Sequence, residues 1–302
     1  MTPSALAAIV PRVLLGTAEN FAILAGSGIT NSGSTTISGD ISGAPRGDVG
    51  VSPDASITGK SSITLLGGVY HQADAVALDA KNALVTAYND AAGRSTTATI
   101  ATELGGETLD PGVYDSASGT FEITGTLTLD GQNNPDSVFI FQMNTTLVTA
   151  SYSNIQLING ARFCRIFWQV GSSATLGEYS TFVGHILALT SITVNTRATI
   201  YGQLLARNGA VTLLSNTIIN GFCGYPTSGT PYPGMTQVYY YPPLTSTSIG
   251  GIRPFPYATN LPPTGDTTSD RSAPGILAVG AGFVLILAGI SLYLFKRKKA
   301  KS

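Results

Sequence analysis

The sequence predicts a mainly β protein built as a solenoid, with one long α-helix packed alongside and a transmembrane helix near the C-terminus. Short β-branched segments recur with threonines at Thr175, Thr193 and Thr212, which lie 18 and then 19 residues apart. A fixed period of about 20 residues is typical of coils that stack on one another. The two helices are indicated by an alanine-rich stretch at residues 70–92 and an apolar run at residues 275–295.

A second row recurs between these threonines, at residues 182–188 and again at residues 200–206, with an offset of 18 residues. Coils of parallel strands stack about 4.8 Å apart, so equivalent outward residues form straight ladders along a solenoid. In this chain the ladders are expected to be small and hydroxylated.

The composition fits a flat and weakly charged β surface. Charged residues make up 11% of the 302 residues, against roughly 25% in an average globular protein. The formal net charge is −1, but the segment from Gly265 onward holds two acidic and six basic residues and carries +4. The remaining −5 lies on the body of the protein, which argues against nucleic acid as a partner.

Two cysteines, Cys164 and Cys223, flank the repeats and are too few for a zinc site. In an exported protein we expect them to form one disulfide, which would close a loop of about 60 residues and stabilise the fold by about 3–4 kcal/mol. Two buried free thiols are the alternative, because a sequence does not show whether the two sulfurs meet.

The solenoid domain is expected at residues 13–223, after a short apolar N-terminal segment. Residues 1–12 lack a basic n-region and do not form a complete signal peptide. Because the C-terminal pattern described below implies export, we interpret them as a possible remnant of one. From Val13 to Gly67 the chain alternates apolar and small polar residues between turn-forming segments. That pattern fits solenoid coils or a β-sandwich equally well.

The stretch from Tyr70 to Ala92 contains no Gly or Pro and is dominated by alanine, which predicts a helix that ends at Gly93. Its narrow apolar face is expected to comprise Val76, Ala80, Ala83, Leu84, Ala87, Tyr88 and Ala91. Small side chains allow a close approach, so this helix should lie flat against a sheet. A helix on a membrane surface would need bulkier apolar residues and more Lys or Arg.

Further strands are predicted at residues 112–114, 121–123, 127–130, 137–141, 155–157 and 166–170. The runs at 138–141 and 166–170 are almost continuously apolar, as expected of strands buried on both faces. The polar segment at 130–136 has enough oxygens for a calcium loop, but it lacks the EF-hand spacing and the closing Glu. We therefore expect a solvated turn and no metal site.

The periodicity stops after Cys223. Residues 224–260 are rich in Pro, Tyr, Ser and Thr, which favours a semi-rigid extended linker over a packed core. The apolar run at 275–295 would span about 31 Å as a helix, enough to cross a membrane. The basic tail at 296–302 predicts a cytoplasmic C-terminus and an exported body.

The segment before this apolar run is Leu261-Pro262-Pro263-Thr264-Gly265. Together with the apolar run and the basic tail, it resembles the LPxTG sorting signal of Gram-positive surface proteins. The resemblance implies that a sortase cleaves between Thr264 and Gly265 and joins Thr264 to peptidoglycan. A membrane-inserted precursor would then become a protein of the Gram-positive cell wall. A permanent single-pass anchor is the alternative.

Several stretches of the body occur together and in a characteristic order: LGTAENFAIL at 15–24, the helix ending in Ala87-Tyr88, PGVY at 111–114, LTLDG at 127–131, VFIFQ at 138–142 and FWQVGSSATLG at 167–177. In these stretches the chain resembles the ice-binding-like family of microbial antifreeze and ice-adhesion proteins. The resemblance implies a right-handed parallel β-helix of triangular section with one long helix packed alongside.

The resemblance also implies a flat face whose short Thr, Ser, Ala, Gly and Asn motifs hold surface water in an ice-like order. The matching positions are Ser173, Thr175, Ser191, Thr193, Ala210 and Thr212. Alternation along each strand places this set on one side, and the residues between them are apolar and prefer the core. Arg197 and Arg207 are near in sequence and would interrupt a flat face if they shared it.

The sequence thus predicts a cell-wall-anchored ice-binding surface protein, antifreeze or ice-adhesion, that uses no cofactor. The alternative is a non-enzymatic adhesin or structural stalk on the same fold, which binds a glycan or another extended surface. This alternative stays open because threonine is also a common strand residue.

An enzyme is not expected. Parallel β-helices that act on polysaccharides need clustered acids and bases, whereas this body has two histidines, His71 and His185. Glu178 would approach His185 only by accident of coil geometry, and no GxSxG, P-loop or metal-ligand spacing occurs. We expect His185 to be a capped or edge-exposed solenoid residue.

Overall fold

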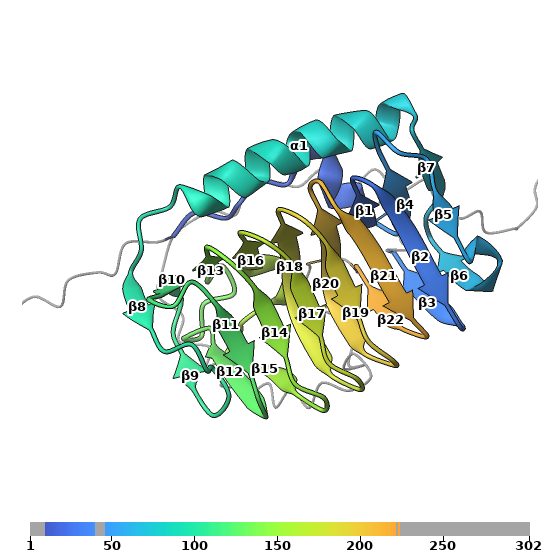
Figure 1. Ribbon diagram of the computed structural model, residues 1–302. Coiled ribbons are helices and arrows are strands. Elements are labelled where there is room, and N and C mark those ends of the chain that lie inside the picture. The colour runs from blue at the N-terminus through green and yellow to red at the C-terminus, as the bar shows by residue number, and fades with distance from the viewer. Residues whose placement is uncertain (1–9, 40–45, 222, 224–302) are drawn as a thin grey trace, which may run out of the picture. The chain divides into compact units, whose positions relative to one another are not determined.

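The body of the chain is a stack of three-sided coils with a helix along one side (Figure 1). The computed structural model describes residues 10–39, 46–221 and 223. Strands of successive coils pair in parallel, and α1 (Ala75–Ala92) is the single α-helix of the described residues. The predicted mainly β fold, with parallel strands and one helix, is confirmed.

Each coil contributes strands to three faces. The first face, beneath α1, contains β8 (Ala98–Ile100), β10 (Gly112–Ser116), β13 (Phe139–Met143), β16 (Ile166–Val170), the second halves of β18 (Thr181–Ala188) and β20 (Thr199–Ala206), β1 (Phe21–Ala25), β4 (Asp48–Val51) and β7 (Tyr70–Gln72). The second face contains β11 (Phe121–Ile123), β14 (Leu147–Thr149), β17 (Ala174–Leu176), β19 (Ile192–Val194), β21 (Ala210–Leu214), β2 (Gly28–Ser32) and β5 (Ile57–Thr58). The third face contains β9 (Thr108–Leu109), β12 (Thr126–Asp130), β15 (Asn154–Ile158), the first halves of β18 and β20, β22 (Thr217–Ile219), β3 (Thr35–Ser38) and β6 (Ile63–Leu66).

Strands β18 and β20 turn a corner between the third and first faces without breaking. Both bend at a glycine with positive φ, Gly184 (φ 113°) and Gly202 (φ 142°), which lie side by side in register. A Cβ at Gly202 would collide with the backbone of Gly184. Glycine is required here because no other residue adopts this backbone at such a close approach.

The first coil of the chain stacks on its last coil. β1 pairs with β20, β2 with β21 and β3 with β22. The coil formed by β4, β5 and β6 then stacks outward on β1–β3. Helix α1 runs back along the first face to β8 at the opposite end of the stack (Figure 1).

The helix starts later than the sequence predicted. Residues Tyr70–Gln72 form β7 and complete the pairing of β4, and the helix begins after Asp74, whose side chain accepts a hydrogen bond from the Ala77 amide at 2.8 Å. In the first turn it is Ala77 that faces the sheet, so the prediction that Val76 lies on the apolar face is wrong, and Val76 is 48% exposed. The buried residues of α1 are Ala77, Ala80, Lys81, Leu84, Ala87, Tyr88 and Ala91.

Lys81 is a cation within this otherwise apolar stripe. Its Nζ donates to the carbonyl of Ala206 at 2.7 Å and to that of Arg207, and so it caps the end of β20. Burial, with a smaller contribution from the Arg207 charge, lowers the pKa of Lys81 to about 8. The helix is thereby fastened to the corner between the first and second faces.

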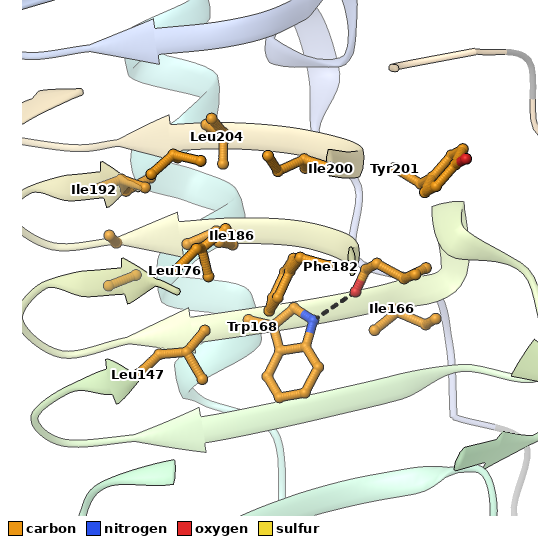
Figure 2. Close-up of a cluster of buried hydrophobic side chains, with 14 of the residues drawn as sticks. Leu147, Ile166, Trp168, Leu176, Phe182, Ile186, Ile192, Ile200, Tyr201 and Leu204 are labelled. Atoms are coloured by element: carbon orange, nitrogen blue, oxygen red, sulfur yellow. Dashed lines mark hydrogen bonds between the residues drawn. The ribbon is translucent and has the colours of Figure 1, made fainter. Parts of the chain in front are cut away.

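The interior of the coils is filled by aromatic and aliphatic side chains (Figure 2). Trp168 is fully buried, stacks on Phe141 with ring centroids 4.0 Å apart, and donates its indole N–H to the Val183 carbonyl at 3.0 Å. Aliphatic residues of the second face, such as Leu176 and Ile192, close the core from the other side. This dense core keeps the second face rigid.

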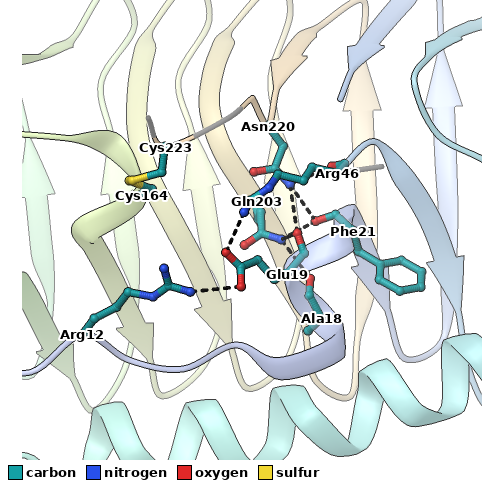
Figure 3. A network of polar contacts seen from close by, with 9 residues as sticks. All are labelled: Arg12, Ala18, Glu19, Phe21, Arg46, Cys164, Gln203, Asn220 and Cys223. Carbon is teal, nitrogen blue, oxygen red and sulfur yellow. Dashed lines mark hydrogen bonds and ion pairs between the residues drawn. A yellow bond between two sulfur atoms is a disulfide. The ribbon is translucent and has the colours of Figure 1, made fainter. Parts of the chain in front are cut away.

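Polar side chains hold the N-terminal segment onto the last coil (Figure 3). The amide of Gln203 donates to the carbonyls of Ala18 and Phe21. The amide of Asn220 donates to the Arg46 carbonyl at 2.7 Å and lies 3.4 Å from the Phe21 carbonyl. Both amides are buried, so these bonds fix how the first and last coils join.

An ion pair and a disulfide reinforce the same region. The Glu19 carboxylate lies 3.0 Å from each of two guanidinium groups, those of Arg12 and Arg46. Cys164 and Cys223 are joined as a disulfide, with Cα atoms 5.7 Å apart. The bond ties η3 (Phe163–Arg165), which packs on β18 and β20, to the end of the last coil.

Several predictions concern other parts of the chain. The signal-peptide remnant lies almost entirely outside the described residues, and the linker at 224–260, the sorting motif at 261–265 and the apolar run at 275–295 lie wholly outside them. Within the described ranges, no helix combines the length and the apolar character needed to cross a membrane.

Replacing both cysteines, Cys164→Ser with Cys223→Ser, should lower the free energy of unfolding by about 3–4 kcal/mol, because the unfolded chain loses a constraint on a loop of about 60 residues. Urea unfolding of the full chain measures this difference. The parent protein in a reductant serves as the control and should match the variant. An unchanged midpoint would contradict a stabilising role for the bond.

Candidate functional site

Five threonines form a straight outward ladder across the second face. Backbone pairing places Thr175 beside Thr193, Thr193 beside Thr212, Thr212 beside Thr30 and Thr30 beside Thr58. At a spacing of about 4.8 Å per coil, this first ladder is about 19 Å long. It ends at Val148, which pairs with Thr175.

The alternation of side chains agrees with the orientation that the sequence predicted. Ala174, Ile192 and Val211 are buried, and the threonines that follow them are partly exposed. Within the described residues, the hydroxyls of the first ladder make no hydrogen bond to protein. They are therefore left to bond to water, while their methyl groups share the same surface.

The other predicted site residues form a second column on this face with a different role. Ser173 bonds to the Thr190 hydroxyl at 2.7 Å, and its oxygen accepts from the Ser191 amide at 3.3 Å. The Ser191 hydroxyl accepts in turn from the Ala210 amide at 3.3 Å. Ser173, Ser191 and Ala210 are partly exposed, and the two serines tie neighbouring coils together beside the threonines.

Sequence analysis missed Thr30 and Thr58, which extend the ladder by two coils. A signal for them exists, because each follows a small residue and an isoleucine, in Gly28-Ile29-Thr30 and Ser56-Ile57-Thr58. The same triplet form occurs at Ser191-Ile192-Thr193. The triplets at 28–30 and 56–58 lie outside the local period of the C-terminal repeats, so this period alone does not place their threonines in the ladder.

The two nearby arginines do not share the flat face. Arg207 lies at the corner near α1, where its guanidinium is 5.5 Å from the Tyr88 ring and 3.3 Å from the Asn89 side chain. Arg197 lies at the opposite corner, between β19 and β20, with φ of 57° and its guanidinium over the Tyr179 ring. The first ladder is thus free of charged side chains from Thr175 to Thr58.

The corner that carries Arg197 changes in size along the stack. Tyr152 and Tyr179 occupy it in the preceding coils with stacked rings 5.2 Å apart, and Tyr152 is 72% exposed. Beyond Arg197 the corner positions are Ser215 and Gly33, which also have positive φ. The corner therefore protrudes at one end of the stack and is small at the other.

A sequence model of the ice-binding-like family matches residues 23–219, a range that includes all five threonines of the first ladder. The chain belongs to the ice-binding-like family. An ice-binding protein of Nostoc sp. (strain HG1) is 43% identical over 209 residues, covering 68% of this chain and 74% of the relative. One from Flammulina populicola is 35% identical over 226 residues, covering 70% of this chain and 90% of the relative.

Solved structures of the ice-binding-like family share the fold. The crystal structure of an ice-binding protein from the Antarctic ascomycete Antarctomyces psychrotrophicus has a TM-score of 0.63 and 40% identity, covering 69% of this chain and 98% of that one. The crystal structure of an ice-binding protein from an Antarctic biological consortium has a TM-score of 0.66 and 40% identity, covering 72% and 96%.

Of the two positions that the sequence suggested for His185, capped or edge-exposed, the structure excludes the exposed one. His185 is 3% exposed, lies 5.3 Å from the Phe167 ring, and has its pKa lowered to about 3, mainly by burial. The ring of Phe163, in η3, lies 6.3 Å from the imidazole, which is buried and neutral at ordinary pH. Glu178 is exposed in the turn between β17 and β18, away from this buried ring.

The polar segment at 130–136 forms a turn with its own hydrogen bonds. The Asp130 carboxylate accepts from the Gln132 amide at 2.8 Å and from the Asn159 side chain at 2.9 Å. The Asn134 side chain accepts from the Asp136 amide at 3.0 Å. These oxygens shape the turn, and the described part of the chain holds no group of three or more His, Cys, Asp or Glu side chains that could bind a metal ion.

Proposed function

We propose that this protein binds ice through the second face of its solenoid, at the first ladder and at the adjacent column of Ser173, Ser191 and Ala210. The observation that carries the proposal is the register of five outward threonines whose hydroxyls have no hydrogen-bond partner among the described residues. Ice-binding relatives that match along the whole body support the choice of ligand.

The chemistry of the ladder suits a solid water surface. A threonine offers a methyl group and a hydroxyl, and its β-branch restricts rotation about χ1, so the positions of both groups are set by the backbone. Each contact with a lattice water is weak, but regular spacing lets many contacts form together. Because the face is rigid before binding, little conformational entropy is lost.

We propose a non-enzymatic role, since the buried neutral His185 and the exposed Glu178 do not form an acid–base pair. A glycan-binding adhesin would need a recessed aromatic surface. The exposed aromatic pair of this body, Tyr152 and Tyr179, stands on a protruding corner beside the flat face. This arrangement favours ice over a sugar as the ligand of the second face.

Replacing Thr175, Thr193 and Thr212 each by Tyr should reduce ice affinity roughly tenfold or more, because weak contacts made together are also lost together. Bulky rings would hold the remaining threonines away from the crystal. Thermal hysteresis and ice-crystal shape, measured with the full chain, report the change. The parent should give faceted crystals, and the triple variant should give a lower thermal hysteresis and an altered crystal shape.

A matched control is Thr86→Tyr, which places the same ring on the exposed side of α1, and it should behave as the parent does. Hysteresis and crystal shape that stay the same as the parent's in the triple variant would move the site to another face. Smooth discs from the parent itself would refute ice binding and favour the adhesin.

We also propose that the body is displayed on a Gram-positive cell wall. The support is the order of the C-terminal pieces: the motif at 261–265, the apolar run at 275–295 and the basic tail at 296–302. A sortase would join Thr264 to peptidoglycan, and residues 224–260 would then separate the solenoid from the wall. Such display would let a cell attach to ice.

In a Gram-positive host with a sortase, wall-released protein should end at Thr264, as measured by mass spectrometry after digestion of the wall. Thr264→Ala should abolish this product, because the carbonyl of the motif threonine is the one transferred. Thr268→Ala, just beyond the motif, is the control and should leave it intact. Full-length protein that remains in the membrane fraction of the parent strain would indicate a permanent anchor instead.

A further inference from the structure

The third face carries a longer ladder of the same chemistry. Thr126 pairs with Asn154, Asn154 with Thr181 and Thr181 with Thr199. The column continues through β22, β3 and β6. We name this column the second ladder; its members are Thr126, Asn154, Thr181, Thr199, Thr217, Thr36 and Thr64.

Burial shows that these side chains point outward. Each member of the second ladder is partly or fully exposed, whereas the residue after it in the strand, such as Leu127, Phe182 or Ile218, lies in the core. Seven positions at about 4.8 Å per coil give a ladder about 29 Å long. None of its members is charged.

Their polar groups are unused, as in the first ladder. Within the described residues, no side chain of the second ladder makes a hydrogen bond to protein. Other hydroxyls of the fold do make such bonds: Thr35 bonds to Asn31 and Thr149 accepts from the Gly177 amide. A threonine with a purely structural role can form a hydrogen bond to a neighbouring group of the protein. The hydroxyls of the second ladder form none within the described residues and are left to bond to water.

The two ladders are related by a repeat in the sequence. In four coils a threonine of the first ladder is followed six residues later by one of the second, as in Thr193 and Thr199, and in one coil five residues later, as in Thr212 and Thr217. The tyrosine pair stands between the faces at one end of the stack, but at the other end Ser215 and Gly33 keep the corner small. On its far side the second ladder is bounded by η3, which packs on β18 and β20.

We infer that the third face is a second ice-binding surface, centred on the second ladder and oriented differently from the first. This inference rests on the proposed function, since it takes ice as the ligand. Because the two faces meet at an angle, one molecule presents two arrays of hydroxyls and methyls to different planes of a crystal. The protein would then cover more ice planes than a solenoid with a single active face.

The test uses the full chain fused to a fluorescent protein and bound to hemispheres of single-crystal ice, on which the labelled planes are recorded. The first-ladder variant is the triple tyrosine substitution at Thr175, Thr193 and Thr212. The second-ladder variant replaces Thr181, Thr199 and Thr217 by Tyr, and Thr86→Tyr is the matched control. Circular dichroism melting verifies that every variant is folded.

We expect each triple variant to lose a different subset of the planes that the parent and the control label. A variant that combines all six substitutions should lose all of these planes. This inference would be overturned if the first-ladder variant labelled no plane and the second-ladder variant labelled the same planes as the parent. The proposed function would still stand in that case. A parent that labels no plane would overturn both.

Discussion

The surface of this protein depends on the pairing between the first and the last coil of the chain. β1, β2 and β3 continue all three faces from β20, β21 and β22 in unbroken parallel register. The buried amides of Gln203 and Asn220 hold the N-terminal segment at this junction, and the disulfide secures η3 nearby. Without this joint the first ladder would end at Thr212.

The same register explains why the faces are flat. Parallel coils repeat the same side-chain direction at each step, so a small residue in one coil lies beside a small residue in the next. Along the first ladder, the nearby bulky and charged groups lie at the corners, where Tyr179 and Arg197 adopt positive φ and where Arg207 contacts α1. Hydroxyls therefore lie on flat faces, and the same backbone order supports both proposed surfaces.

Local patterns in the sequence predicted much of this arrangement. The repeat with threonines at 175, 193 and 212 indicated a solenoid and the outward side of each strand, because alternation and period are local properties. Local patterns do not predict contacts between distant segments. Thr30, for example, joins the ladder beside Thr212 although the two positions are 182 residues apart. The burial of His185 has a similar cause, since the rings of Phe163 and Phe167 that lie beside it come from the preceding coil.

We propose that residues from both ends of the body build one continuous ice-binding face. A comparison of Thr30→Tyr with Thr212→Tyr in the full chain tests this, measured as the fraction of protein taken up by a slowly growing ice crystal. Both threonines lie side by side in the first ladder, so uptake should fall to a similar extent in the two variants. Uptake that falls for Thr212→Tyr and stays at the parent level for Thr30→Tyr would contradict it.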